Sequence, residues 1–545
     1  MAPRRSVKNT AWESQNRSPA DGFGGRFVPN DRVNSDARGA VAAQEDTTIG
    51  RPVVSSSPLQ RLPEAQQYIT QSLARVFAAA GAELYLVGGV VRDALLAHDI
   101  PADLDFATSA QPAQTRELLE AAGARSVYLV GERFGTVAAI FGDEPEAVTV
   151  EVTTYRKEVY PDATRFPAVA FDATLIDDLS RRDFTMNAIA VEASSGAVVD
   201  PWGGEADIVL ALVRAVGDPD ERFTEDPLRL LRAARFVSQL GFRLDWETEQ
   251  AMSRQAESLG RISHERILME LTRLLLGPYV DHGLDVLRRT GLLTVALPEL
   301  RPLAAEAETD LTTRLGREKD LWDHTVRVVR QSPPRAAVRW AALLHDAGKP
   351  QTRGVGPDGE VHFFGHERVG ADLAGRIFAR LNADKTLRST VRALVELHSR
   401  PAAFEASWTD SAVRRLALEA GPVWDDLLDL AAADVTSGRE RKRIEAARRV
   451  AGLRERFMQL QEQAALASLE SPLDGNELMR LFDRPPGPWI KRVKEHLREL
   501  VIDGELAPDD RDRAAQIAVS LLETDEQFTD AQATMPASVS RYPHR

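Results

Sequence analysis

The sequence predicts an α+β domain followed by a series of all-α domains. Short apolar runs separated by turns and amphipathic segments fill residues 84–154, as in a mixed sheet with covering helices. From Asp218 onward the pattern changes to one amphipathic helix after another. At 545 residues the chain is too long for a single hydrophobic core, so we expect three or four domains.

Composition narrows the possible settings of this chain. It has no cysteine, which excludes disulfides, thiolate metal sites and cysteine nucleophiles. No apolar run approaches the ~20 residues of a transmembrane helix, and the N-terminus lacks the apolar segment of a secretory signal. We therefore expect a cytoplasmic protein without membrane contact. With a net charge of −14, nucleic-acid binding would need local basic patches.

A polar segment opens the chain, and a phosphate-binding pattern follows it. Residues 1–60 are rich in Arg, Ser and Asn without periodicity, which predicts a disordered extension with no assigned function. Residues 84–87 predict a strand, Gly88 and Gly89 a tight turn, and residues 90–97 an amphipathic helix. Paired glycines before a helix N-terminus leave backbone N–H groups free to bind phosphate.

Two aspartates flank the start of the next apolar run. Asp103 and Asp105 are two residues apart, so on a strand their side chains point to the same face. Adjacent carboxylates repel each other unless a cation lies between them, and Mg²⁺ bridging substrate phosphates is the usual occupant. The alternative is a surface pair at a strand edge. A glycine phosphate turn followed closely by Asp-x-Asp favours nucleotidyl transfer.

Three further strands are expected after a helix over residues 111–122, and they cover residues 127–130, 135–141 and 147–154. If the last strand lies beside the Asp-x-Asp strand, Glu151 is a third carboxylate near the metal ions. The alternative is an ordinary acidic residue on the open face of a strand. Residues 155–171 are polar and poorly periodic, which predicts a mobile loop.

A charged cluster follows this loop. Arg181, Arg182 and Asp183 precede a segment that we expect to become helical near Phe184. Guanidinium groups bind phosphate in a bidentate manner, so the cluster suits contacts to a triphosphate or a ribose. The alternative is a surface cluster that caps the helix.

A second helix start carries a pattern suited to base selection. Pro227 is expected at the first helical position with Asp226 as its N-cap, and Arg229, Arg232 and Arg235 recur on roughly one face. Cytosine and adenine present a hydrogen-bond donor and then an acceptor, whereas guanine and uracil present the reverse. An Asp226 acceptor with an Arg229 donor would accept C and A and reject G and U. The alternative role of Asp226 is the cap alone.

In order along the chain, LVGGVVRD, DLD, RRDFTMNAIA, DPWGG, EDPLRLLRAARF and RISHER resemble the motifs of class II tRNA nucleotidyltransferases and bacterial poly(A) polymerases. The resemblance implies a palm of the polymerase β type followed by a helical neck. It also implies that Asp103 and Asp105 hold Mg²⁺, and Glu151 is the third catalytic candidate. The candidate nucleotide-binding residues are Gly88, Gly89, Arg92, Arg182, Asp183, Asn187, Asp226, Arg229, Arg232 and Arg235.

A second constellation contains five of the ten histidines, all between residues 324 and 398. In AALLHDAGK, His345 and Asp346 stand at the end of an apolar helix, close enough together to share one metal ion. The spacing resembles the HD phosphohydrolase superfamily, whose sites activate water to attack a phosphate. The implied ligands are His324, His345, Asp346 and Asp434, with His366 and His398 as candidates for a second ion. A divalent transition metal such as Mn²⁺, Ni²⁺ or Fe²⁺ is the expected occupant.

The remaining sequence is helical and charged. Residues 439–456 form either a solvated face or a contact surface for the tRNA backbone, and residues 473–506 resemble the terminal segment of the bacterial enzymes. We expect a disordered extension (1–60), the palm (61–214), a neck for base recognition and RNA binding (215–300), an HD domain (301–440), a C-terminal helical body that binds tRNA (441–524) and a disordered tail (525–545).

The expected activity is addition of C, C and A to the tRNA 3′ end from CTP and ATP, with release of pyrophosphate, accompanied by an HD phosphohydrolase activity. The expected partners are tRNA, CTP and ATP, with no DNA and no membrane. Two alternatives stay open. One is a poly(A) polymerase or an enzyme that adds only CC or only A. The other is an HD hydrolase that uses a nucleotidyltransferase-like domain to bind RNA.

Overall fold

The structure is a computed structural model that covers the full chain. The described residues are 57–130, 135–143, 145–159, 168–171, 173–304, 321–357, 359, 361–435, 440–468, 471–502 and 505–524. The expected disorder of residues 1–56 and 525–545 falls outside this part, as do residues 160–167 of the expected mobile loop. The chain divides into two compact units, residues 1–48 and 49–545, and all described residues belong to the second unit.

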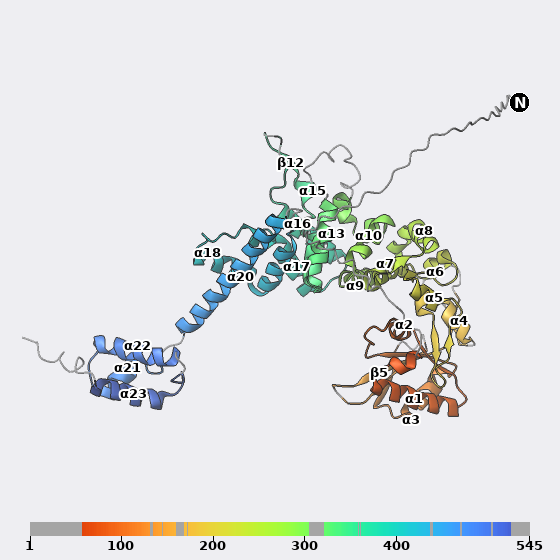
Figure 1. The fold of residues 1–545 in the computed structure, drawn as a ribbon, viewed down its shortest axis with the longest axis horizontal. Helices are drawn as coiled ribbons and strands as arrows, with labels where there is room; N and C mark the ends of the chain where they lie inside the picture. Colours follow the sequence, from red (N-terminus) through yellow and green to blue (C-terminus); the bar gives the residue numbers. More distant parts are fainter. Residues whose placement is uncertain are drawn as a thin grey trace, which may run out of the picture. The chain divides into compact units, whose positions relative to one another are not determined.

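A mixed seven-stranded sheet forms the N-terminal part of the described chain (Figure 1). Its order is β3-β4-β5-β2-β1-β8-β9, and β2 and β5 are parallel whereas the other neighbours are antiparallel. The strands are β1 (Leu84–Val87), β2 (Leu104–Thr108), β3 (Ser126–Val130), β4 (Thr136–Phe141), β5 (Val148–Thr154), β8 (Ala190–Glu192) and β9 (Val198–Val199). The sheet therefore brings the Asp-x-Asp strand next to the strand of Glu151, as the sequence analysis required.

Helices cover this sheet because their apolar stripes need partners. In α1, for example, Ile69, Leu73 and Phe77 are buried. The helices of this part are α1 (Glu64–Ala79), α2 (Gly89–Leu96), α3 (Pro112–Ala121), α4 (Leu175–Ser180) and α5 (Gly204–Val209). A short hairpin, β6 (Lys157–Val159) with β7 (Ala168–Ala170), occupies the ends of the segment expected to be a loop.

Two expectations about local structure are wrong. No helix begins near Phe184 in the described chain, because Phe184 is extended and bridges to Ala215, and Thr185–Asn187 form a single 3-10 turn before β8. The N-terminal extension was also expected to stay disordered to residue 60, but Pro58–Arg61 form a 3-10 turn. Arg61 fixes this turn by donating a hydrogen bond to the carbonyl oxygen of Ala94 at 2.7 Å.

Helices make up nearly all of the rest of the chain, in agreement with the predicted fold class. The first group is α6 (Pro219–Glu225), α7 (Leu228–Leu240), α8 (Trp246–Gln255), α9 (His264–Leu275), α10 (Val280–Arg289) and α11 (Leu292–Ala296), with a small ladder of β10 (Leu212–Val213) and β11 (Arg243–Leu244). The second group is α13 (Leu321–Gln331), α14 (Ala336–Leu344), α15 (Lys349–Thr352), α16 (His366–Arg380), α17 (Lys385–Leu397), α18 (Asp410–Ala420) and α19 (Trp424–Ala433), with a hairpin of β12 (Gly354–Val355) and β13 (Val361–His362).

Specific hydrogen bonds join these two groups of helices. The buried Arg339 of α14 donates to the carbonyl oxygen of Leu275 at the end of α9, at 2.7 Å. The indole N–H of Trp340 donates to the Thr272 hydroxyl of α9 at 3.0 Å. One continuous core extends from Leu62 to Leu460, so α9 and α14 pack as neighbours within it.

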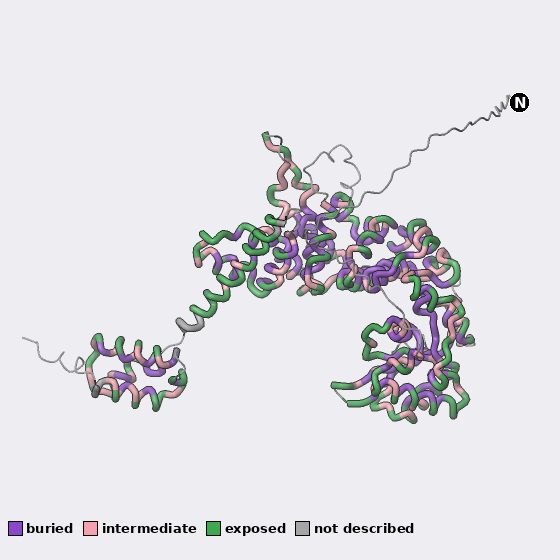
Figure 2. The backbone as a smooth tube through the Cα atoms, in the orientation of Figure 1, coloured by how far each residue is buried: buried purple, intermediate pink, exposed green. Residues whose placement is uncertain are grey.

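The C-terminal helices bury a core of their own. The long helix α20 (Glu440–Ser468) exposes most of its turns (Figure 2). Beyond it, α21 (Gly475–Phe482), α22 (Pro488–Ile502) and α23 (Arg511–Thr524) enclose a separate apolar cluster that contains Leu478, Val493 and Leu497. None of the described helices is long and apolar enough to cross a membrane.

Candidate functional site

A cleft of about 570 Å³ opens between the sheet and helix α7. All ten residues predicted to bind nucleotide line it, together with Asp105. Gly88 lies at its floor with φ of +79°, a conformation that side chains rarely adopt. A Cβ there would lie 3.3 Å from the Arg182 guanidinium and 3.7 Å from the Asp105 carboxylate. Glycine therefore keeps the backbone close to both groups.

Three carboxylates meet on neighbouring strands. In the parallel ladder of β2 and β5, Asp105 lies directly opposite Glu151. Burial and the nearby Asp103 raise the pKa of Asp105, while Arg182 acts in the opposite direction. Burial and the charges of Asp105 and Asp103 raise the pKa of Glu151 as well. This mutual repulsion is what a bound divalent cation relieves, so the three residues fit a Mg²⁺ site.

Asp183 is held by protein groups rather than left open to a ligand. Its buried carboxylate accepts hydrogen bonds from Arg232 at 2.8 and 2.5 Å and from the Asn187 amide at 3.0 Å. Burial would raise the pKa of Asp183, but Arg232 and Asn187 outweigh it and lower the pKa to about 2. Asp183 thus remains ionised and orients two residues that line the cleft.

The predicted base readers sit together at the start of α7. One carboxylate oxygen of Asp226 accepts from the Leu228 backbone N–H at 3.1 Å, and the other accepts from Arg266 at 3.0 Å. Asp226 therefore does cap the helix, which begins at Leu228. Arg229 donates to Glu225 at 2.7 Å and to the Arg181 carbonyl at 2.6 Å. These bonds fix the direction of the guanidinium at the edge of the cleft.

The last arginine of the series is anchored behind the cleft. Arg235 is buried, donates to the buried Glu270 at 2.6 Å, and places its guanidinium 4.1 Å from the centre of the Phe236 ring. It therefore joins α7 to α9 and stiffens the cleft wall. Sequence reasoning gave no role to three further lining residues, which are Arg156, Phe236 and Arg266. Arg266 lies in the RISHER motif and could have been suspected, whereas Arg156 and Phe236 carry no signal of their own.

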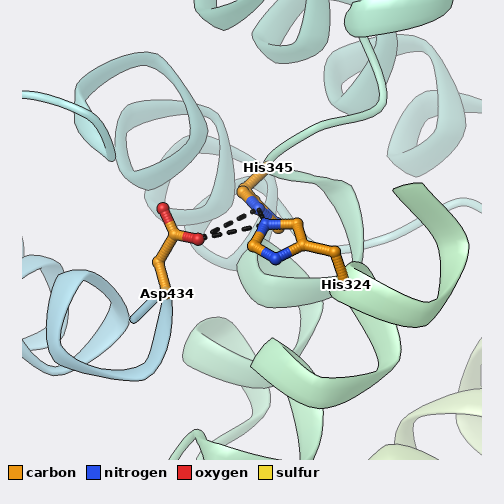
Figure 3. A group of neighbouring side chains, drawn as sticks. All are labelled: His324, His345 and Asp434. Atoms are coloured by element: carbon orange, nitrogen blue, oxygen red, sulfur yellow. Dashed lines mark hydrogen bonds and ion pairs between the residues drawn. The ribbon is translucent and has the colours of Figure 1, made fainter. Parts of the chain in front are cut away.

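The second constellation forms a compact buried cluster. His324 Nε2 lies 3.2 Å from His345 Nε2, 3.1 Å from Asp434 and 3.3 Å from Asp346 (Figure 3). Five helices or their ends supply the ligands, so residues more than one hundred positions apart converge. The six predicted residues form two adjacent groups, His324, His345 and Asp434, and Asp346, His366 and His398.

The imidazole rings are oriented for metal binding. Nδ1 of His345, His366 and His398 each donates to a backbone carbonyl, at 2.8, 2.9 and 2.7 Å. The Nε2 atoms are thereby left to face the carboxylates, as in most metal-binding histidines. His366 Nε2 lies 3.6 Å from Asp346, and Lys349 contacts the same carboxylate at 2.7 Å.

Charge in this cluster also matches a bound cation. Burial lowers the pKa of His345, but Asp346 and Asp434 outweigh it and raise the value to about 9. Burial and the charge of His345 lower the pKa of His398 to about 4, so that ring is neutral at pH 7. The carboxylates thus demand positive charge between them, and nitrogen and oxygen donors suit a divalent transition metal. HD families and nucleotidyltransferases generally use divalent metals.

Comparison with known proteins places these two sites in a family. Residues 84–214 match the family model "Poly A polymerase head domain", and residues 241–303 match "Probable RNA and SrmB- binding site of polymerase A". Residues 310–438 match the HD domain. A CCA-adding enzyme of a Geobacillus species is 34% identical over 427 residues, which cover 78% of this chain and 90% of that protein.

The chain belongs to the family of CCA-adding enzymes and related tRNA nucleotidyltransferases.

Another relative of this nucleotidyltransferase is the A-adding tRNA nucleotidyltransferase of Deinococcus radiodurans. It is 36% identical over 447 residues, which cover 79% of this chain and 94% of the relative. Among solved structures, the Bacillus stearothermophilus CCA-adding enzyme in complex with CTP superposes with a TM-score of 0.53 at 27% identity, covering 87% of this chain and 100% of that one. The comparisons confirm the predicted fold class and the prediction of a nucleotidyltransferase.

Proposed function

We propose that this nucleotidyltransferase adds C, C and A to the 3′ end of tRNA from CTP and ATP. The main support is the pairing of a carboxylate site on β2 and β5 with one acceptor and one donor, Asp226 and Arg229, on the opposite wall of the cleft. That pairing suits cytosine and adenine alike. The Geobacillus relative named a CCA-adding enzyme supports the same activity.

The reaction joins the terminal hydroxyl of the tRNA to the α-phosphate of the incoming nucleotide. The hydroxyl loses its proton, a new P–O bond forms, and the bond to the β-phosphate breaks to release pyrophosphate. Mg²⁺ at Asp103 and Asp105 would lower the pKa of the hydroxyl and screen the developing charge. Glu151 adds a third negative charge beside these carboxylates and strengthens the site for a cation.

The other residues of the cleft hold and select the nucleotide in this proposal. Backbone N–H groups at Gly88 and Gly89 and the guanidinium of Arg182 bind phosphate oxygens. Asp183 keeps Arg232 in place toward the same phosphates. For base selection, Asp226 must exchange its bond from Arg266 for one from the exocyclic amine, since both compete for the same oxygen.

We assign the parts of the chain as follows. Residues 61–214 bind the phosphates and the metal, and residues 215–300 read the base. The helices from residue 441 to residue 524 contact the tRNA backbone, where α20 exposes most of its turns. The HD cluster at residues 301–440 hydrolyses phosphate esters with a divalent transition metal such as Mn²⁺, Ni²⁺ or Fe²⁺ held by His324, His345, Asp346 and Asp434.

Purified protein given tRNA that lacks CCA, with CTP and ATP separately and together, tests the proposal. We expect two added nucleotides with CTP alone and three with both. The Deinococcus relative raises a second candidate, an enzyme that adds only the terminal A. That activity would give no product on tRNA lacking CCA and one addition on tRNA ending in CC. Long A tails on unrelated RNA would instead identify a poly(A) polymerase.

A further inference from the structure

A small aromatic platform stands beside the HD cluster. It consists of His362 at the end of β13 and Phe364 two residues later, whose rings stack with centroids 4.4 Å apart and planes inclined by 27°. The Phe364 side chain is 80% exposed. A single exposed apolar side chain carries little meaning on its own. Here the ring belongs to a supported pair, and the support is specific.

The support comes from the glycine that pairs with His362 across the hairpin. Gly354 lies opposite His362 in the β12–β13 ladder. A Cβ at Gly354 would lie 2.3 Å from the imidazole Cε1, so only a glycine lets the ring press against the strand. His362 is thus packed between the Gly354 backbone and the Phe364 ring. The outer ring keeps its position while its exposed face remains available to a ligand.

The platform is directly connected to the HD cluster. Between its rings and the ligand His366 lie only Phe363 beside His362 and Gly365. His366 Nδ1 donates to the Phe363 carbonyl at 2.9 Å, and the same Phe363 ring lies 5.6 Å from Lys349 Nζ. Phe364 and His366 are two residues apart, so their Cα atoms are at most about 7 Å apart. The base and the phosphate of one nucleotide can span such a distance.

We propose that His362 and Phe364 form a base-stacking platform, so that the HD site takes phosphate esters that carry a nucleobase. Every base has a π-face, and stacking on an aromatic side chain requires no particular sequence. Lys349 adds a positive charge beside Asp346 for the phosphate. This inference rests on the hydrolase activity proposed for the HD cluster. In that reaction water adds to phosphorus, the ester P–O bond breaks, and the leaving oxygen takes up a proton.

Tryptophan at the platform provides a binding readout that does not depend on activity. We would compare Phe364→Trp with Leu418→Trp, a control on α18 at a side chain that is 82% exposed. Stopped-flow mixing with AMP in Mn²⁺ should quench the fluorescence of Phe364→Trp more than that of Leu418→Trp. Ribose 5-phosphate, which lacks the base, should quench neither. Equal responses of the two variants to AMP would overturn the platform.

Hydrolysis provides the second readout. Stacking contributes about 1–3 kcal/mol per base, so Phe364→Ala should raise KM for AMP by about 5- to 150-fold. The same variant should leave KM for ribose 5-phosphate and pyrophosphate release in the palm unchanged, and Leu418→Ala should change none of them. Gly354→Ala, which displaces the His362 ring without touching a predicted ligand, should act like Phe364→Ala. An unchanged KM for AMP in Phe364→Ala would refute the platform.

The two readouts separate this inference from the hydrolase activity beneath it. If the unaltered protein releases phosphate from neither compound, but AMP still quenches Phe364→Trp, the hydrolase proposal fails and the platform stands. If both compounds are hydrolysed equally and AMP does not quench, the hydrolase stands and the platform fails. A short oligonucleotide with a 3′-terminal phosphate distinguishes the two sources of the ligand. Tighter binding than AMP assigns an RNA end, and equal or weaker binding assigns free nucleotides.

Discussion

Replacing Asp183 by asparagine removes a buried negative charge that orients the cleft. The carboxylate accepts two hydrogen bonds from Arg232 and one from Asn187, and its pKa is lowered from 3.8 to about 2. A carboxyl group with a lowered pKa stabilises the fold above the pKa of the unfolded chain. That stabilisation is lost as the pH falls through the folded value. From these two values it amounts to about 2 kcal/mol at pH 7 and about half as much at pH 3.

The assay is urea unfolding of Asp183→Asn and of the unaltered protein at pH 7 and pH 3. We expect the variant to be less stable by about 2 kcal/mol at pH 7, and the difference to shrink at pH 3. Asp220→Asn is the matched control, because its partner Arg254 is exposed and such surface pairs contribute about 0–1 kcal/mol. A loss equal to that of the control, or a difference that grows toward pH 3, would refute the reasoning.

The same variant also tests how the cleft holds the nucleotide. Without the carboxylate, Arg232 loses the group that directs it, so KM for CTP and ATP should rise in parallel with the loss of stability. Asn187 keeps its contact with Arg92 at 2.8 Å and should limit the damage to one side of the cleft. Unchanged KM values in a clearly destabilised Asp183→Asn would restrict Asp183 to a purely structural role.

Three further predictions concern the metal sites and base choice. Asp105→Asn should abolish nucleotide incorporation and pyrophosphate release while the melting temperature stays close to normal, and near-normal incorporation would exclude it as a metal ligand. Asp226→Ala should lose about 1–3 kcal/mol of discrimination against UTP and GTP, measured with all four nucleotides. A less stable protein that still rejects both would leave only the capping role. Mn²⁺ at about 100 times its Kd should stabilise the protein by about 2.7 kcal/mol, and His324→Ala should remove this gain. An equal gain in the variant would contradict the proposed ligand.

Local patterns were sufficient for most of the strands and helices of the palm. The run at residues 84–87, the paired glycines and the segment behind them became β1, the turn and α2 because each short-range signal agrees with the others. The failure near Phe184 has a tertiary cause. The backbone of Thr185 donates to the carbonyl of Arg214 at 2.9 Å, a partner almost thirty residues away, and this bond holds the segment extended.

The sequence by itself determined which chemical groups this protein contains and in what order. The Asp-x-Asp pair, the Asp226 to Arg235 series and the histidines near AALLHDAGK were all visible as motifs with a definite chemistry. Only the tertiary structure decided which of them face a ligand and which hold other side chains. Asp183 pairs with Arg232, Arg235 is buried against Glu270, and Phe364 stacks outward on His362. Such roles depend on contacts between residues far apart in the chain, and packing of the whole core, not local spacing, fixes those contacts.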